Sequence, residues 1–211
     1  MKINFLGDSI TEGWGASSPE KGFVTLVGEV LHCEVNNYGI GGTRLAIQQK
    51  PSLEPRWDLD FCSRVNNMDK DADIVFVFGG TNDYGHGDAP FGEFGDQDPH
   101  TFYGAVDYII NQLLLNYKKE QIVFILPLYR ANENNPRGDG YKISPLKTLQ
   151  DYREAIIKVL LKYSIKILDI KDDIGKAEGN PLFIDGLHPN DAGYQKIAAL
   201  VIQYINNHFL K

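Results

Sequence analysis

The chain has 211 residues, of which 43% are hydrophobic, and its 21 Lys and Arg residues against 28 Asp and Glu residues give a formal net charge of −7. This length and composition suit one globular domain with a sizeable core, so we expect a single domain over residues 1–211. The acidic balance argues against nucleic acid or an anionic membrane as a partner and favours a small molecule. The sequence leaves the oligomeric state open.

The apolar stretches are too short to cross a membrane, because the most apolar one, 156–170, contains three lysines and a crossing needs about 20 consecutive apolar residues. The first apolar run starts at Ile3 and reaches Gly7 four residues later, which predicts no export leader and a cytoplasmic protein. Cys33 and Cys62 form no Cys-x-x-Cys pair. We therefore expect two free core thiols and neither a disulfide framework nor a zinc site.

The hydrophobic pattern alternates between short buried strands and amphipathic helices. The expected strands cover residues 3–6, 35–38, 74–78, 122–126 and 165–168. The expected helices cover residues 23–31, 102–117, 146–163 and a last segment that begins after Asn190. Strand–helix alternation implies right-handed crossovers, and it predicts a three-layer, flavodoxin-like α/β sandwich around a five-stranded parallel sheet.

Two long connections, 84–100 and 128–145, follow the third and fourth expected strands. Loops of this length in a compact domain are usually functional or disordered. Both lie at the carboxyl edge of the sheet, where open α/β folds bind their ligands. We therefore expect the chemistry at that edge.

A serine and a distant Asp-x-x-His pair are the first candidates for that chemistry. Ser9 follows the first strand, where its hydroxyl could be a nucleophile, although serine at such a turn is most often only a helix cap. Asp185 and His188 precede the last helix, and their spacing can bring the carboxylate to Nδ1 and leave Nε2 free as a base. Because both sites fall at one sheet edge, the topology favours a Ser–His–Asp relay.

Acyl transfer also needs donors for the oxyanion, and two further loops at this edge can supply them. The glycines of segment 39–43 let a backbone amide approach a ligand, and segment 79–83 offers the side-chain amide of Asn82. Each of these loops alone is an ordinary turn sequence.

The four features in this order resemble the SGNH hydrolases, also called the GDSL esterase family, over nearly the whole chain. The blocks that carry the resemblance are Gly7-Asp8-Ser9-Ile10-Thr11, Gly39-Ile40-Gly41-Gly42-Thr43, Gly80-Thr81-Asn82-Asp83 and Asp185-Gly186-Leu187-His188-Pro189. The resemblance implies Ser9 as nucleophile, His188 as base and Asp185 as its orienter. It implies an oxyanion hole made of the Ser9 amide, the Gly42 amide and the Asn82 side chain. Many family members have an acidic residue between the glycine and the threonine of this block, whereas here Thr43 follows Gly42 directly. A shift of one residue is therefore open, and Gly41 is the alternative donor.

These expectations favour a serine esterase that needs no cofactor or metal and works through an acyl-enzyme. We expect a small acyl group, such as acetyl, on a polar carrier such as a sugar, because neither long loop forms a broad apolar groove. The residues expected to contact the substrate are Asp8, Arg44, Tyr84 and Tyr129. Arg44 could equally form a surface salt bridge, and Trp14 and Trp57 could line the pocket or only pack.

Several alternatives stay open. A short-chain lysophospholipase or thioesterase would use the same machinery, whereas a catalytically silent relative would only bind carbohydrate. A flavodoxin-like flavin or phosphate site is disfavoured, because Asp8 and Glu12 would repel a phosphate. A solvated acidic loop is a better interpretation than a metal site for Asp83, His86, Asp88, Glu93, Asp96 and His100, whose spacing fits no common metal motif.

Overall fold

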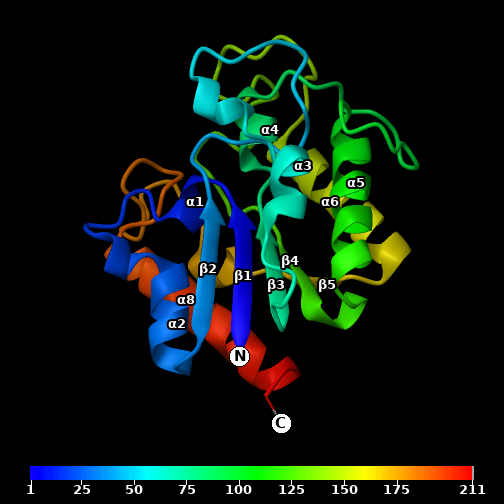
Figure 1. Ribbon diagram of the computed structural model, residues 1–211. Coiled ribbons are helices and arrows are strands. Elements are labelled where there is room, and N and C mark those ends of the chain that lie inside the picture. Colours follow the sequence, from blue (N-terminus) through cyan, green and yellow to red (C-terminus); the bar gives the residue numbers. More distant parts are fainter. Residues whose placement is uncertain (211) are drawn as a thin grey trace.

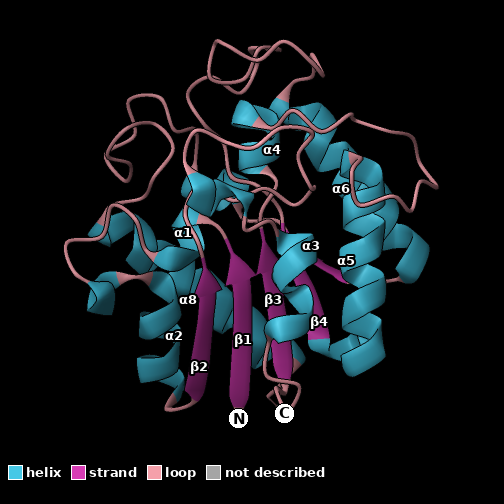
Figure 2. Cartoon of the chain, turned by 45° about the horizontal axis from the view of Figure 1, so that its top comes forward, coloured by secondary structure: helices cyan, strands magenta, loops and turns pink. Residues whose placement is uncertain are grey.

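The computed structural model describes residues 1–210 and has a central sheet of five parallel strands (Figures 1 and 2). The strands are β1 (Lys2–Gly7), β2 (Glu34–Gly39), β3 (Ile74–Phe78), β4 (Ile122–Ile125) and β5 (Lys166–Leu168). Their order across the sheet is β2-β1-β3-β4-β5. This order is the flavodoxin-like one, so the predicted fold class is confirmed.

Helices cover both faces of the sheet, as Figure 1 shows. The α-helices are α1 (Ser9–Glu12), α2 (Phe23–Leu31), α3 (Phe61–Arg64), α4 (Thr81–His86), α5 (Phe102–Asn116), α6 (Leu149–Tyr163), α7 (Lys171–Ile174) and α8 (Asp191–His208). Four short 3₁₀ helices are η1 (Pro19–Lys21), η2 (Pro55–Asp58), η3 (Val65–Asn67) and η4 (Lys119–Gln121). Among residues 1–210, no helix combines the length and the apolar composition that a bilayer crossing requires.

The three central strands, β1, β3 and β4, are buried on both faces, and their side chains alternate between two hydrophobic clusters. In β3, Ile74, Phe76 and Phe78 pack in the cluster of α2 and α8, whereas Val75 and Val77 pack in the cluster of α3, α5 and α6. Successive side chains of a strand point to opposite faces, so a continuous apolar run is what a covered central strand requires. The two clusters are the two interfaces of a three-layer structure.

The structure differs from the sequence prediction at three places. Helix α6 begins at Leu149 rather than at 146, because the Thr148 side chain accepts the Asp151 amide and caps the helix there. Segment 84–100 is not structureless, since α4 occupies its start and the Phe91 ring packs on neighbouring aromatic rings of α5 and α6. Cys33 is only partly buried, unlike Cys62, because it lies just beyond the end of α2.

The turn from β1 into α1 is fixed by a buried carboxylate. Asp8 is 1% exposed and caps α1 by accepting the Ile10 amide at 3.0 Å. Burial raises the pKa of Asp8 to about 7, against the lowering effect of the Ile10 hydrogen bond and with a further increase from the nearby Asp83. Between about pH 4 and pH 7 the folded protein therefore holds a proton on Asp8 that the unfolded chain has released.

We predict that Asp8→Asn keeps the cap but removes this pH dependence. In the wild type, the Asp8 contribution to the free energy of unfolding is favourable at low pH and is lost as the pH rises to about 7. The variant should thus gain stability relative to wild type between pH 5 and pH 8, by on the order of a few kcal/mol. Urea unfolding of both proteins at the two pH values measures this, and an equal difference at both would contradict it.

Candidate active site

The structure brings Ser9, His188 and Asp185 into one hydrogen-bonded chain. Ser9 is the first residue of α1, directly beyond β1, and is 6% exposed. Its Oγ lies 3.0 Å from His188 Nε2, and His188 Nδ1 lies 2.7 Å from Asp185 Oδ2. The three side chains therefore meet as the sequence predicted, although 179 positions separate the serine from the histidine.

A tight turn before α8 orients the histidine. Asp185 Oδ1 accepts the backbone amides of Leu187 at 3.0 Å and His188 at 2.8 Å, which leaves Oδ2 for the imidazole. Partial burial raises the pKa of Asp185, but the hydrogen bonds from His188 and Leu187 outweigh burial and hold this pKa below its usual range. An ionised Asp185 favours the tautomer with its proton on Nδ1, so Nε2 can accept the proton of Ser9.

Free backbone amides lie beside this serine. The Ser9 amide starts a helix and has no partner within it, and the Gly42 amide donates to no acceptor in residues 1–210. The Gly41 amide donates to Glu12 Oε2 at 2.7 Å, so it is already occupied. Asn82 Nδ2 donates to the Thr43 carbonyl at 3.0 Å, which leaves its second hydrogen free. Of the two glycines that the sequence left open, Gly42 therefore has the free donor.

Only glycine fits at position 42. Its φ is +77°, in the left-handed region, and a Cβ there would lie 2.1 Å from Trp57 Cδ1. The aromatic ring of Trp57 thus packs directly against the backbone of this loop, which a side chain would prevent.

A cavity of about 340 Å³ opens in front of Ser9 and His188. Its lining residues are Ser9, Glu12, Trp14, Gly41, Gly42, Arg56, Trp57, Asn82, His86, Asp139, Tyr141, Leu187 and His188. Both tryptophans line it, which decides between the two interpretations of the sequence. The Trp14 ring is half exposed and its centroid lies 4.3 Å from that of His188, so it forms one wall next to the base.

The four residues predicted to contact the substrate lie outside this cavity, and that prediction is corrected. Asp8 is the buried cap of α1. Tyr84 is fully buried, and its hydroxyl donates to backbone carbonyls of the 128–145 segment. Tyr129 donates to Asp172 at 2.7 Å in a separate groove. Arg44 is 2% exposed and lines a neighbouring groove, while its guanidinium is held by an ion pair with Asp58.

Arg44 instead fixes the segment that carries Trp57. Its Nη2 lies 2.9 Å from Asp58 Oδ1, and the buried Asp83 accepts the amides of Leu45 and Ala46 at 2.9 and 3.0 Å. Burial raises the pKa of Asp83, while these two amides lower it. These contacts hold segment 44–60 over the carboxyl edge of the sheet, at the top of Figure 1.

Six residues that line the cavity were not predicted as parts of the site: Glu12, Arg56, His86, Asp139, Tyr141 and Leu187. His86 was named only within the acidic loop, and Tyr141 lies in the long connection 128–145. Glu12 lies three residues after Ser9 on the same helical turn, and Leu187 precedes His188, so proximity in sequence could have indicated both. Arg56 and Asp139 come from irregular segments without periodicity and carried no such signal. The acidic loop noted in the sequence shows no metal site, since residues 1–210 contain no group of three or more His, Cys, Asp or Glu side chains placed to bind one ion.

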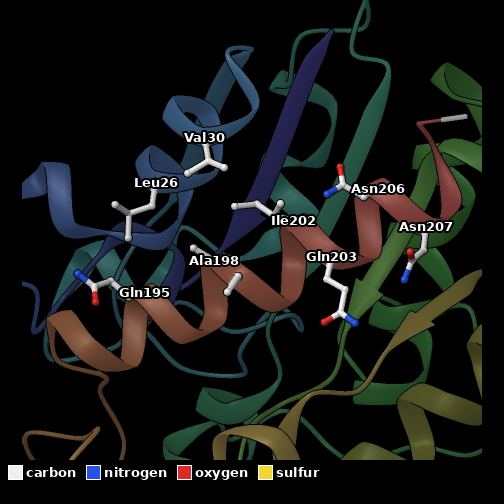
Figure 3. A pocket seen from close by; sticks show the side chains of 9 residues that line it. Leu26, Val30, Gln195, Ala198, Ile202, Gln203, Asn206 and Asn207 are labelled. Atoms are coloured by element: carbon white, nitrogen blue, oxygen red, sulfur yellow. The ribbon is translucent and has the colours of Figure 1, made fainter.

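A second hollow, of about 490 Å³, lies between α2 and α8 (Figure 3). Its lining consists of Leu26, Val30, Gln195, Ala198, Ala199, Ile202, Gln203, Asn206 and Asn207. None of these side chains is a nucleophile, acid or base, so this hollow offers no catalytic chemistry. The cavity at Ser9 is smaller, but it is the one that holds the reactive groups.

Comparisons with known proteins identify a family and several solved structures of the same fold. The model of the GDSL-like lipase/acylhydrolase family matches residues 5–196. A crystal structure from Lactobacillus plantarum is 28% identical with a TM-score of 0.81, covering 99% of this chain and 98% of that one. A lipase/acylhydrolase from Enterococcus faecalis is 21% identical with a TM-score of 0.67, covering 98% and 95%. Est24, described as a carbohydrate acetylesterase from Sinorhizobium meliloti, is 15% identical with a TM-score of 0.71, covering 99% of each.

A search of curated proteins finds no match. The family model nevertheless spans most of the chain and includes Ser9, Gly42, Asn82, Asp185 and His188. The structures place these five residues in a fold that the relatives share. The chain therefore belongs to the GDSL-like lipase/acylhydrolase family.

Proposed function

We propose that this family member is a serine esterase that transfers the acyl group of a carboxylic ester to Ser9 and then to water. The observation that carries the proposal is the chain of hydrogen bonds from Asp185 through His188 to Ser9, next to the free amide of Gly42. A nucleophile with an oriented base and donors for an oxyanion is the minimal equipment for acyl transfer.

In this mechanism His188 Nε2 removes the proton of Ser9 Oγ as the oxygen attacks the ester carbonyl. The Ser9 amide, the Gly42 amide and the free hydrogen of Asn82 Nδ2 stabilise the resulting oxyanion. The imidazolium, held by Asp185, gives its proton to the leaving alkoxide, and an acyl-enzyme remains. His188 then deprotonates a water that attacks the acyl-enzyme, which releases the acid and restores Ser9.

A short acyl group on a polar carrier is the substrate that we favour. The cavity of about 340 Å³ combines aromatic walls with polar groups: the charged Glu12, Arg56 and Asp139, the imidazole of His86 and the amide of Asn82. Aromatic faces with hydrogen-bonding groups between them suit a sugar better than an alkyl chain. The description of the fold relative Est24 as a carbohydrate acetylesterase supports this choice.

One observation favours a second candidate, a lysophospholipase or thioesterase. A neighbouring groove of about 470 Å³ continues past Trp57 and Tyr141 and is lined by Pro51 and the fully exposed Leu53. The sequence predicts no broad apolar groove. This one is formed largely by segment 44–60, for which the sequence predicts neither a helix nor a strand. A longer acyl chain could lie there.

We predict that Ser9→Ala and His188→Ala abolish turnover of p-nitrophenyl acetate without unfolding the protein. Each change removes a group that makes or breaks a bond to the substrate, and the loss should reach several orders of magnitude in kcat. Steady-state kinetics and circular dichroism measure activity and fold. Wild-type rates in a folded Ser9→Ala variant would refute the mechanism.

Asn82→Ala tests the oxyanion hole. Because the oxyanion exists only in the transition state, loss of one donor should lower kcat by about 10²–10³-fold and change KM little. Asn82 also holds the Thr43 carbonyl, so urea unfolding must accompany the kinetics. A rise in KM with unchanged kcat would assign Asn82 to ground-state binding instead.

The length of the acyl chain separates the two candidate functions. We predict a higher kcat/KM for p-nitrophenyl acetate than for the octanoate, since the cavity at Ser9 is short and lined by polar groups. A clear preference for octanoate would favour the lysophospholipase or thioesterase alternative. Replacement of Leu53 by Asp should then selectively weaken turnover of the longer ester.

A further inference from the structure

The amide of Gly42 belongs to the peptide group between two adjacent glycines. Neither residue has a side chain to restrict rotation, so this peptide could turn and point its N–H away from the cavity at little cost. A free donor in this position is useful only if something outside the loop fixes its direction. The contacts on either side of the peptide therefore decide whether the donor is in place.

Two side chains hold the backbone on both sides of this peptide. On one side the Gly41 amide donates to Glu12 Oε2 at 2.7 Å, and Arg56 holds the other oxygen of Glu12, also at 2.7 Å. On the other side the Gly42 carbonyl lies 3.1 Å from His86 Nε2. The Gly41 amide belongs to the preceding peptide and the Gly42 carbonyl to the following one, so these contacts fix the backbone on both sides of the Gly41–Gly42 peptide.

His86 is held so that both of its ring nitrogens face hydrogen-bond acceptors. It lies at the end of α4, its side chain is 11% exposed, and its ring packs on Trp57 with centroids 4.7 Å apart. Nε2 faces the Gly42 carbonyl, and Nδ1 lies 3.5 Å from Asp139 Oδ2. The Gly42 carbonyl can only accept a hydrogen bond, so Nε2 must carry a hydrogen to satisfy this contact.

The acceptor on Nδ1 is a carboxylate over the whole physiological pH range. Partial burial raises the pKa of Asp139, but the bond from His86 and the charge of Arg130 outweigh it and lower this pKa to about 2. Arg130 also forms an ion pair with Asp139, which fixes the carboxylate in front of His86. The arrangement Arg130–Asp139–His86–Gly42 is a second histidine–carboxylate pair that faces the same cavity as Ser9.

We propose that His86 is a positioning residue of the oxyanion hole: its Nε2 hydrogen binds the Gly42 carbonyl and holds the loop that carries the Gly42 amide beside Ser9. This inference rests on the proposed esterase function. It assigns to His86 no contact with the reacting atoms. Without this donor, the Gly42 carbonyl would lose its partner and the loop would be held only from the Glu12 side.

Other charged groups near His86 must be separated from it in any pH experiment. The neighbouring hollows that His86 lines also contain Arg44, Lys50, Asp88 and Lys142, and Glu12 with Arg56 lies across the cavity. Of these, Lys142 matters most, because burial lowers its pKa to about 8, against the raising effect of Asp83 and other carboxylates. The comparison of variants is therefore made at one pH, 7, at which Lys142 keeps its charge.

The experiment measures kcat and KM for p-nitrophenyl acetate at pH 7 in wild type, His86→Phe and His86→Gln. Phenylalanine keeps a ring against Trp57 but donates no hydrogen bond, so kcat should fall about 10–100-fold while KM changes less than about twofold. Glutamine offers an amide donor in place of Nε2 and should keep kcat within a few-fold of wild type.

His100→Gln is the matched control, because His100 is exposed and pairs with Asp98 far from the cavity, and it should behave as wild type. Labelling of Ser9 by a fluorophosphonate tests the esterase function separately. If Ser9 is not labelled, the proposed esterase function itself is wrong, whatever the result for His86. With Ser9 labelled, an unchanged kcat in His86→Phe overturns the role of His86. A His86→Gln variant that loses as much kcat as His86→Phe overturns it as well.

Discussion

The parallel direction of all five strands is the constraint on which the site depends. In the sheet register, Gly7 of β1 lies opposite both Gly39 of β2 and Phe78 of β3, so three strands end at the same level. The segments that follow these three strands carry Ser9 at the start of α1, the Gly41–Gly42 peptide in a loop and Asn82 at the start of α4. An antiparallel strand at any of these places would send its loop to the opposite edge. Proximity of the reactive groups is thus a result of topology before any side chain is considered.

A partly buried side chain, Arg64, then fixes the loops that follow the strands. Arg64 donates to the carbonyls of Tyr38 at 2.6 Å and Gly7 at 3.3 Å, and to Thr43 Oγ1 at 3.0 Å. Burial lowers the pKa of Arg64 to about 10, so it remains a cation at neutral pH. Because these bonds join loop backbone to a rigid core, the donors are arranged before a substrate binds, which is the condition for efficient electrostatic stabilisation.

The fold and the reactive centre were predictable, whereas the rest of the cavity was not. A continuous apolar run such as 74–78 is typical of a covered strand. Short motifs after strands indicated Ser9 and Asn82, and the Asp-x-x-His motif before the last helix indicated His188. Sequence reveals the type of a polar residue but not its direction, so the buried cap Asp8 was mistaken for a substrate contact. Segments 44–60 and 128–145 have no periodicity, and tertiary contacts alone place them.

The nucleophile lies on the first turn after β1, and its base precedes the last helix of the described chain. A ribosome releases these segments in that order, so a growing polypeptide holds the serine and both glycines long before an imidazole reaches them. Helix α8, which packs against α2, arrives at the same late stage. In the proposed mechanism, a polypeptide that lacks this last segment has no base for Ser9, so activity would arise only once the final layer has closed.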